Sequence, residues 1–245
     1  MKYFSFLNAI YIALLNKKLR LAFYPCPNCE RKRLFLITGM ENYQTRCLGC
    51  HGTLISLGLI SYLKKNKKLI SLDHVYELSF HGVLFNFLKS RAKNFYFSEF
   101  FSKNKKNRYV KGVRNEDVQN LTFKNNQFSL ITSTEVFEHV PNYKKGFQEV
   151  CRVLKNQGYF IFTVPLFDHK KTLQIASVSN KKIKWHFKKE YHGSRITGPN
   201  SVPVFWHHSK LQITKDLIKS GFKKAVLVEV ILCKGRKQIV VTAQK

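Results

Sequence analysis

Acidic residues are scarce in this sequence. Its 245 residues include 14 Asp and Glu against 43 Lys and Arg, which gives a formal net charge of +29. Such an excess points to an anionic partner, such as nucleic acid, an anionic membrane surface or a phosphorylated substrate. The basic residues are mostly Lys and are spread along the whole chain, which is also rich in Asn, Phe and Ile. We therefore favour compositional bias over a dedicated binding surface as the origin of the charge.

Long apolar runs are also lacking. The run over residues 4–15 is interrupted by Ser, Asn and Tyr, and a membrane-spanning helix needs about 20 apolar residues. A single early Lys and no clear cleavage site also argue against a signal peptide. We interpret residues 1–22 as an N-terminal amphipathic helix that packs on the main domain. The alternative is a helix at a membrane surface, with its basic end against anionic lipid.

Cysteines are few, but their spacing is informative. Four of the six form two C-x-x-C pairs, which are Cys26 with Cys29 and Cys47 with Cys50. Each such turn can present two thiolates to one Zn²⁺ ion, which prefers four tetrahedral ligands. His51 follows directly, but four thiolates already complete a structural site. The spacing therefore predicts a zinc ribbon over residues 23–56, and paired thiols without a disulfide framework indicate a reducing cytoplasm.

The centre of the chain, residues 113–165, reads as a βαβ unit. An apolar run over residues 128–131 precedes a helix pattern, and a second apolar run covers residues 159–164. The helix pattern places four apolar residues on one face: Phe147, Val150, Cys151 and Leu154. Two parallel strands need a crossover of about this length. Open α/β sheets bind ligands beyond the carboxyl ends of their strands, so we expect the chemistry to lie within residues 132–139.

Further elements are expected on both sides of this unit, with turn residues separating them. In chain order they are a helix over 57–68, a strand over 75–78, a turn over 79–82, a helix from 83, a strand over 94–101, a strand with its exit loop over 110–117, a helix-like basic segment over 168–190, a long ordered loop over 190–208, a helix over 209–220, and an antiparallel hairpin of strands over 225–233 and 238–243.

Acidic residues recur where the predicted strands end. Glu77, Glu99, Asp117 and Glu135 each lie near the end of an expected strand. Single acids at these positions can be helix N-caps. Four in a chain with so few acids instead indicate a ligand site along one sheet edge.

Four stretches make the chain resemble class I S-adenosylmethionine-dependent methyltransferases, with a type 11-like methyltransferase domain. They are VYELSFHG, EDVQNLTFKNNQFSLITSTEVFEHV, EVCRVLKNQGYFIFTVP, and a closing Gly-Phe with its strands. The resemblance covers about residues 70–245. It implies an α/β fold with a Rossmann-like seven-stranded methyltransferase sheet, helices on both faces and a C-terminal antiparallel hairpin. The expected domains are thus the N-terminal helix 1–22, the zinc ribbon 23–56 and the methyltransferase domain 57–245.

The resemblance also implies roles for individual residues. Glu77 corresponds to the acid beside the methionine end of the cofactor, Glu99 to the acid that binds both ribose hydroxyls, and Asp117 to the contact with the adenine amine. Glu135 and the pair Glu138-His139 correspond to positions under the sulfonium and the acceptor. The implied cofactor-binding residues are Glu77, Ser79, His81, Gly82, Glu99, Asp117, Val118, Thr134 and Glu135.

Glycine is missing where the family has a glycine-rich turn. The family's glycine positions are occupied here by Ser79, His81 and Val83, and Gly82 alone lies nearby. Glycine lets a backbone approach a ligand closely, so its loss here bears on how tightly this turn can hold the cofactor.

His139 is the candidate catalytic residue. It could act as a general base, or it could instead hold the following loop by hydrogen bonds.

Three functional hypotheses follow. The first is a methyltransferase using S-adenosylmethionine and a structural zinc ion, acting on a small molecule, a glycan or a lipid precursor. The second is a methyltransferase acting on RNA, with the ribbon and lysines binding phosphates. The third is a non-catalytic, methyltransferase-like binding protein that has lost the cofactor.

Overall fold

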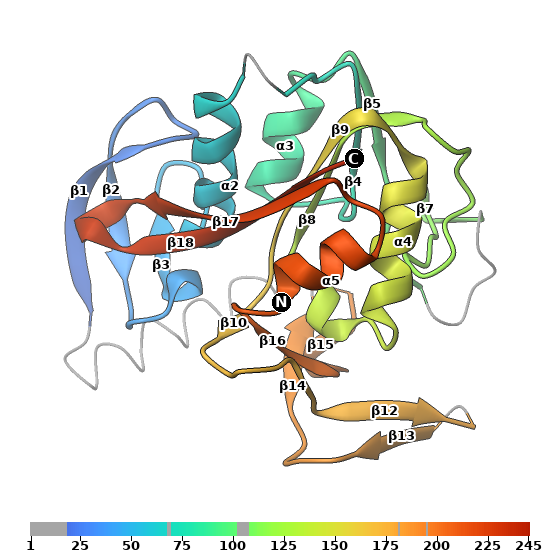
Figure 1. The fold of residues 1–245 in the computed structure, drawn as a ribbon. Coiled ribbons are helices and arrows are strands. Elements are labelled where there is room, and N and C mark those ends of the chain that lie inside the picture. Colours follow the sequence, from blue (N-terminus) through green and yellow to red (C-terminus); the bar gives the residue numbers. More distant parts are fainter. Residues whose placement is uncertain (1–18, 68–69, 102–107, 181, 195) are drawn as a thin grey trace. The chain divides into compact units, whose positions relative to one another are not determined.

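The computed structural model describes residues 19–67, 70–101, 108–180, 182–194 and 196–245 (Figure 1). These residues form two compact units, and the chain passes between them several times. The first unit contains the described residues up to 67 together with 81–91 and 229–240. The second contains the described residues of 70–80, 92–228 and 241–245. The predicted zinc ribbon lies in the first unit and the predicted βαβ centre in the second.

A three-stranded antiparallel sheet begins the first unit. Its strands are β1 (Arg20–Cys26), β2 (Arg31–Ile37) and β3 (Thr45–Cys47), in the order β1-β2-β3. A short 3-10 helix, η1 (Asn42–Gln44), connects the last two strands. Most of the predicted helix 1–22 lies outside the described residues, but its last three residues belong to β1, so the predicted helix is wrong there. The alternating exposure of these residues suits a strand with one buried face.

The first unit also contains two α-helices. Helix α2 (Leu54–Lys65) starts three residues earlier than expected and contributes Leu57, Leu59 and Ile60 to the core. Helix α3 (Val83–Lys89) starts at the predicted residue. The 3-10 turn η3 (Cys233–Gly235) also lies in this unit.

The central sheet has six strands in the order β17-β18-β9-β8-β4-β5. They are β4 (His74–Glu77), β5 (Asn94–Phe97), β8 (Phe128–Thr134), β9 (Leu154–Thr163), β17 (Lys224–Ile231) and β18 (Lys237–Gln244). Strands β5, β4, β8 and β9 are mutually parallel, and β18 is antiparallel to β9. The predicted α/β fold is thus confirmed, and the short connection between β17 and β18 gives the predicted C-terminal hairpin.

The expected seventh strand is reduced to one bridge among the described residues. Residues 110–117 instead contain the two-residue strands β6 (Tyr109–Val110) and β7 (Val113–Arg114), which pair with each other. A single parallel bridge joins Glu99 to Asn115 at the end of β5. The side chain of Asn115 strengthens this link, since its Oδ1 accepts from the Phe101 amide at 2.7 Å.

Aromatic packing builds the core of the second unit. Helix α4 (Tyr143–Val153) presents Phe147 to Phe137, Phe160 and Phe162, with ring centroids 4.7 to 6.2 Å apart. All four rings are fully buried, and such pairs add to the free energy gained from burying apolar area. Helix α5 (Ile213–Lys219) is tied to α4 because the Tyr143 hydroxyl donates to Asp216 Oδ2 at 2.7 Å.

The segment between β9 and α5 differs most from expectation. The described residues of 168–190 contain no helix, and those of 190–208 form strands where a long ordered loop was expected. The strands are β10 (Leu166–Phe167), β11 (Leu173–Gln174), β12 (Ala176–Ser179), β13 (Lys182–Trp185), β14 (Tyr191–Ser194), β15 (Gly198–Pro203) and β16 (Trp206–Ser209).

These strands form small local sheets. Strand β12 pairs with β13, β14 pairs with β15, and β16 lies between β10 and β11. In Figure 1 the β12–β13 hairpin extends away from the central sheet. The segment has no apolar stripe that a helix could bury, so local strand pairing satisfies its backbone groups instead. Within the described parts of the chain, no helix is long and apolar enough to cross a membrane.

Candidate functional site

The carboxyl ends of β4, β5 and β8 meet at one edge of the central sheet. The Leu78 amide donates to the Thr132 carbonyl at 3.0 Å, and the Ser98 amide donates to the Glu77 carbonyl at 3.3 Å. These bonds place the ends of three parallel strands at the same level. Ligand sites of open α/β sheets occur at such edges, so the predicted acids share the edge that a ligand would occupy.

Glu77 is the last residue of β4, and 1% of its surface is exposed. The Thr132 hydroxyl donates to its carboxyl group. Burial disfavours the charged form and raises the pKa of Glu77 to about 8, although the Thr132 hydrogen bond opposes this rise. The carboxyl is therefore largely protonated in the unliganded protein at neutral pH.

This burial predicts that the free energy of unfolding falls as pH rises. The folded state holds the Glu77 proton more tightly than the unfolded state, in which the pKa is near 4.5. Between these two values the folded state binds more protons, so stability is lost as pH increases towards 9. We expect a loss of about 3–5 kcal/mol from pH 5 to pH 9. Urea denaturation across this range measures it.

The matched variants are Glu77→Gln and Glu229→Gln. Glutamine keeps the size of the buried side chain and can still accept from Thr132, but it does not ionise, so its stability should change much less with pH. Glu229 is exposed and pairs with Lys237 at 2.6 Å. Its variant should follow the wild type. Parallel pH profiles for wild type and Glu77→Gln would contradict the assignment.

Glu99 lies two residues beyond β5 and is half-buried. Its Oε1 accepts from the Phe100 amide at 3.0 Å, and burial raises its pKa to about 7. The Glu99–Asn115 bridge brings the predicted adenine-binding segment to this acid. The charge of Glu99 also contributes to the raised pKa of Glu77.

The two neighbouring acids Glu116 and Asp117 have different surroundings. Buried Glu116 pairs with Arg114 Nε at 2.6 Å and accepts from the Thr122 amide at 3.0 Å, so it has a structural role. Asp117 is half-buried and accepts from both the amide and the side chain of Gln119. Of the pair, Asp117 is the more accessible, and its contact with the adenine amine stays a prediction. Val118 belongs to the hydrophobic core.

The turn after β4 takes an unusual backbone path at its one glycine. Gly82 has a φ of 102° and forms the N-cap of α3. Side chains rarely adopt this φ, although a Cβ there would meet no atom within 4 Å among the described residues. Ser79 belongs to the second unit, and His81 and Gly82 to the first. Their predicted contacts with a cofactor stay predictions.

The residues after β8 place further carboxyl groups at the same edge. Thr134 ends β8, and Glu135 follows with a φ of 51°, its amide bonded to the Thr163 carbonyl at 3.0 Å. Burial raises the pKa of Glu135 to about 7. Glu138 lies in the 3-10 turn η2 (Phe137–His139) and is fully buried. Burial and the nearby Glu135 charge raise the pKa of Glu138 well above its usual range.

His139 is held by the segment that was expected to be a loop. Its Nδ1 donates to the Pro203 carbonyl at 2.8 Å, and its Nε2 lies 3.2 Å from His192 Nδ1. Burial lowers the pKa of His139 to about 4, so the ring is neutral at pH 7. His192 is not among the site residues predicted from the sequence. It lies on β14, which carries it to the end of β8.

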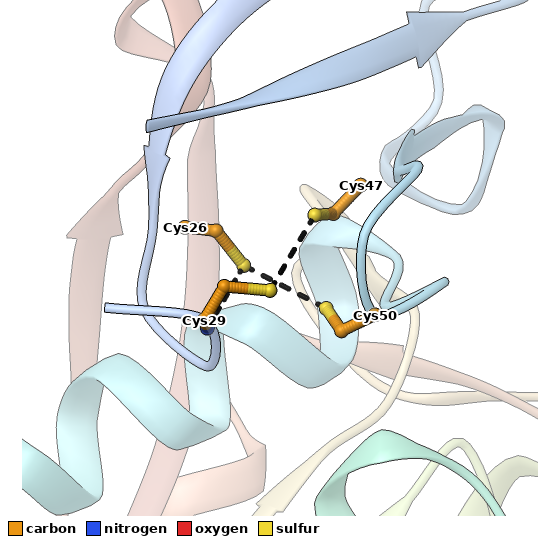
Figure 2. A group of neighbouring side chains, drawn as sticks. All are labelled: Cys26, Cys29, Cys47 and Cys50. Carbon is orange, nitrogen blue, oxygen red and sulfur yellow. Dashed lines mark hydrogen bonds between the residues drawn. The ribbon is translucent and has the colours of Figure 1, made fainter. Parts of the chain in front are cut away.

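The four paired cysteines converge in the first unit (Figure 2). Cys26 Sγ lies 3.6 Å from Cys50 Sγ, and Cys29 Sγ lies 4.0 Å from Cys47 Sγ. Four thiolates at Zn–S distances of about 2.3 Å occupy tetrahedron corners about 3.8 Å apart. The observed separations lie on either side of this value, and the donor set is the one that structural zinc prefers, so the residues fit the ion.

Comparisons with known proteins address the second unit most directly. Residues 85–162 match a family model described as "Methyltransferase domain". Over these residues the chain resembles a methyltransferase domain. Its sheet order agrees with this assignment, because the antiparallel β18 follows four parallel strands.

A solved methyltransferase structure has a similar fold. An S-adenosylmethionine-dependent methyltransferase from Mesorhizobium loti superposes with a TM-score of 0.51 at 14% identity, covering 77% of this chain and 98% of that one. A Listeria monocytogenes protein assigned to the same class gives a TM-score of 0.48 at 17% identity, with the same two coverages. No curated protein matches the chain.

Proposed function

We propose that the chain transfers a methyl group from S-adenosylmethionine to an acceptor. The observation that carries this proposal is the convergence of Glu77, Glu99 and the Asp117 segment at one edge of a methyltransferase sheet. Ionised carboxylates accept from ribose hydroxyls and from an adenine amine. Glu99, beside the end of β5, would accept from the ribose, and Asp117 from the amine.

The end of β8 would receive the reacting part of the cofactor. Thr134 and Glu135 lie at this point, and the ionised form of Glu135 would favour a sulfonium cation. His139 is neutral and its Nδ1 donates to the Pro203 carbonyl, so its free lone pair lies on Nε2. Positioning the acceptor in line with the methyl group would supply much of the rate enhancement.

The acceptor that we propose is a small molecule, a glycan or a lipid precursor. The strands β14 to β16 bring Trp206 and Pro203 against η2, since Trp206 Nε1 donates to the Val140 carbonyl at 2.9 Å and Pro203 binds His139. Ordered strands beside the site would suit a compact acceptor more than an extended chain. The alternative is RNA, favoured by the exposed Arg31 and Lys32 of the ribbon.

The four cysteines would hold one structural zinc ion. A closed site of four thiolates leaves no position for substrate, so the ion would stabilise the ribbon and take no part in methyl transfer. We also propose a cytoplasmic location, because the thiols need a reducing compartment to stay paired on a metal.

Isothermal titration with S-adenosylmethionine and S-adenosylhomocysteine tests whether the chain binds the cofactor, which the proposed activity requires. Binding in the micromolar range is expected, and native mass spectrometry should show one zinc ion per chain. Absence of heat at millimolar cofactor would instead support a non-catalytic binding protein. Retention on RNA that falls steeply with salt concentration would favour the RNA acceptor.

A further inference from the structure

Glu138 is a buried acid with no evident structural role. Its exposed fraction is 0%, and neither carboxylate oxygen makes a hydrogen bond among the described residues. A buried carboxylate without a partner costs several kcal/mol. Groups of this kind are usually explained by a proton or by a bound ion. Its neighbours indicate which of these applies.

Two imidazole nitrogens face the same carboxylate. His139 Nε2 lies 3.5 Å from Glu138 Oε1, and His192 Nδ1 lies 3.8 Å from the same oxygen. The Nδ1 proton of His139 is donated to the Pro203 carbonyl, which leaves a lone pair on its Nε2. His192 Nε2 lies 3.7 Å from Glu190 Oε1, and a proton on this Nε2 would leave the lone pair on Nδ1.

The three donor atoms form a nearly equilateral triangle. The two nitrogens are 3.2 Å apart, which completes edges of 3.2, 3.5 and 3.8 Å. A point equidistant from all three atoms lies about 2.0 Å from each, which is the usual length of a Zn–N or Zn–O bond. We propose that Glu138, His139 and His192 bind one divalent transition-metal ion.

The surrounding residues have the features of a metal site. The Pro203 carbonyl and Glu190 accept, or lie in position to accept, the outer N–H of each ligand histidine, and such partners fix the ring and its tautomer. Glu190 is itself held by His207 Nε2 at 2.7 Å. The side chain of His192 is 37% exposed, so an ion can enter from solvent and retain an open coordination position.

The competing explanation needs no metal. His192 Nδ1 would then donate to His139 Nε2, and Glu138 would be a buried protonated acid. The two explanations differ in whether an added cation binds. Two nitrogens and one carboxylate suit Zn²⁺, Fe²⁺ and Mn²⁺. We choose Mn²⁺ as the probe because the thiolates of the ribbon prefer Zn²⁺ and should remain loaded with it.

Electron paramagnetic resonance of free Mn²⁺ tests the site on the full chain without any cofactor. Wild type should remove about one Mn²⁺ per chain from solution, and added Zn²⁺ should displace it. Glu138→Gln and His192→Gln should each weaken binding more than about 100-fold, as expected for losing a direct ligand. The matched control is His186→Gln, since His186 is exposed on the β12–β13 segment and bonds to Ser177 at 2.9 Å.

Stability measurements guard against a misfolded variant. Glu138→Gln keeps the side-chain volume and removes a buried ionisable group, so its Tm without Mn²⁺ should equal or exceed that of wild type. Saturating Mn²⁺ should raise the Tm of wild type and of His186→Gln only. Absence of Mn²⁺ binding by folded wild type would overturn the proposal, as would unchanged binding by Glu138→Gln. Because cofactor is absent, either result is independent of the proposed methyl transfer.

Discussion

The Glu99→Ala variant should lose about 100-fold in affinity for S-adenosylhomocysteine while remaining folded. Glu99 would accept from two ribose hydroxyls, and hydrogen bonds to a charged group contribute about 1.5–3 kcal/mol each. Losing both corresponds to at least about 3 kcal/mol, or a factor of 100 in Kd. Isothermal titration at pH 8 measures this change, with the exposed Glu229→Ala as the control.

The same residue predicts how cofactor affinity depends on pH. The pKa of Glu99 is raised to about 7 by burial, so at pH 6 most of the population carries a proton that must be released before both hydroxyls can donate. Affinity should therefore rise from pH 6 to pH 8. Glu99→Gln should bind weakly at every pH. If Glu99→Ala changed only the free energy of unfolding, the chain would be a binding protein that has lost the cofactor.

The central strands and α4 could be predicted because their sequence signals are strong. The run at residues 128–131 is buried on both faces of a parallel sheet, and α4 has one clear apolar face. Glu77, Glu99 and Asp117 could be placed together for the same reason: once the strands are parallel, their carboxyl ends share an edge. The prediction that these strands are parallel was therefore sufficient to place these three acids at one edge of the sheet.

Other parts could not be predicted because their structure depends on distant contacts. The strands between β9 and α5 are short, and β16 forms only because β10 and β11 flank it. The strand expected over residues 110–117 keeps one bridge, because β6 and β7 pair with each other instead. His192 is 53 residues from His139. No motif spacing in the sequence predicts that these two residues meet, because the position of His192 depends on the β14–β15 hairpin.

Removal of zinc should unfold the ribbon of the first unit. Its three strands are short, and few of their residues are buried, so apolar burial contributes little stability there. Structural zinc sites contribute about 10–16 kcal/mol of apparent binding free energy, which far exceeds what such a sheet gains by itself. Cys50→Ser should therefore bind zinc much more weakly and give protease cleavage within residues 23–56.

The control for this variant is Cys233→Ser. Cys233 is a buried cysteine of the same unit but lies outside the four-cysteine group, so its variant should keep one zinc ion per chain and resist cleavage. Zinc content is measured by native mass spectrometry and cleavage by limited proteolysis. A ribbon that stays protected in Cys50→Ser after chelator treatment would contradict the structural role, because four thiols without an ion would then suffice to hold the fold.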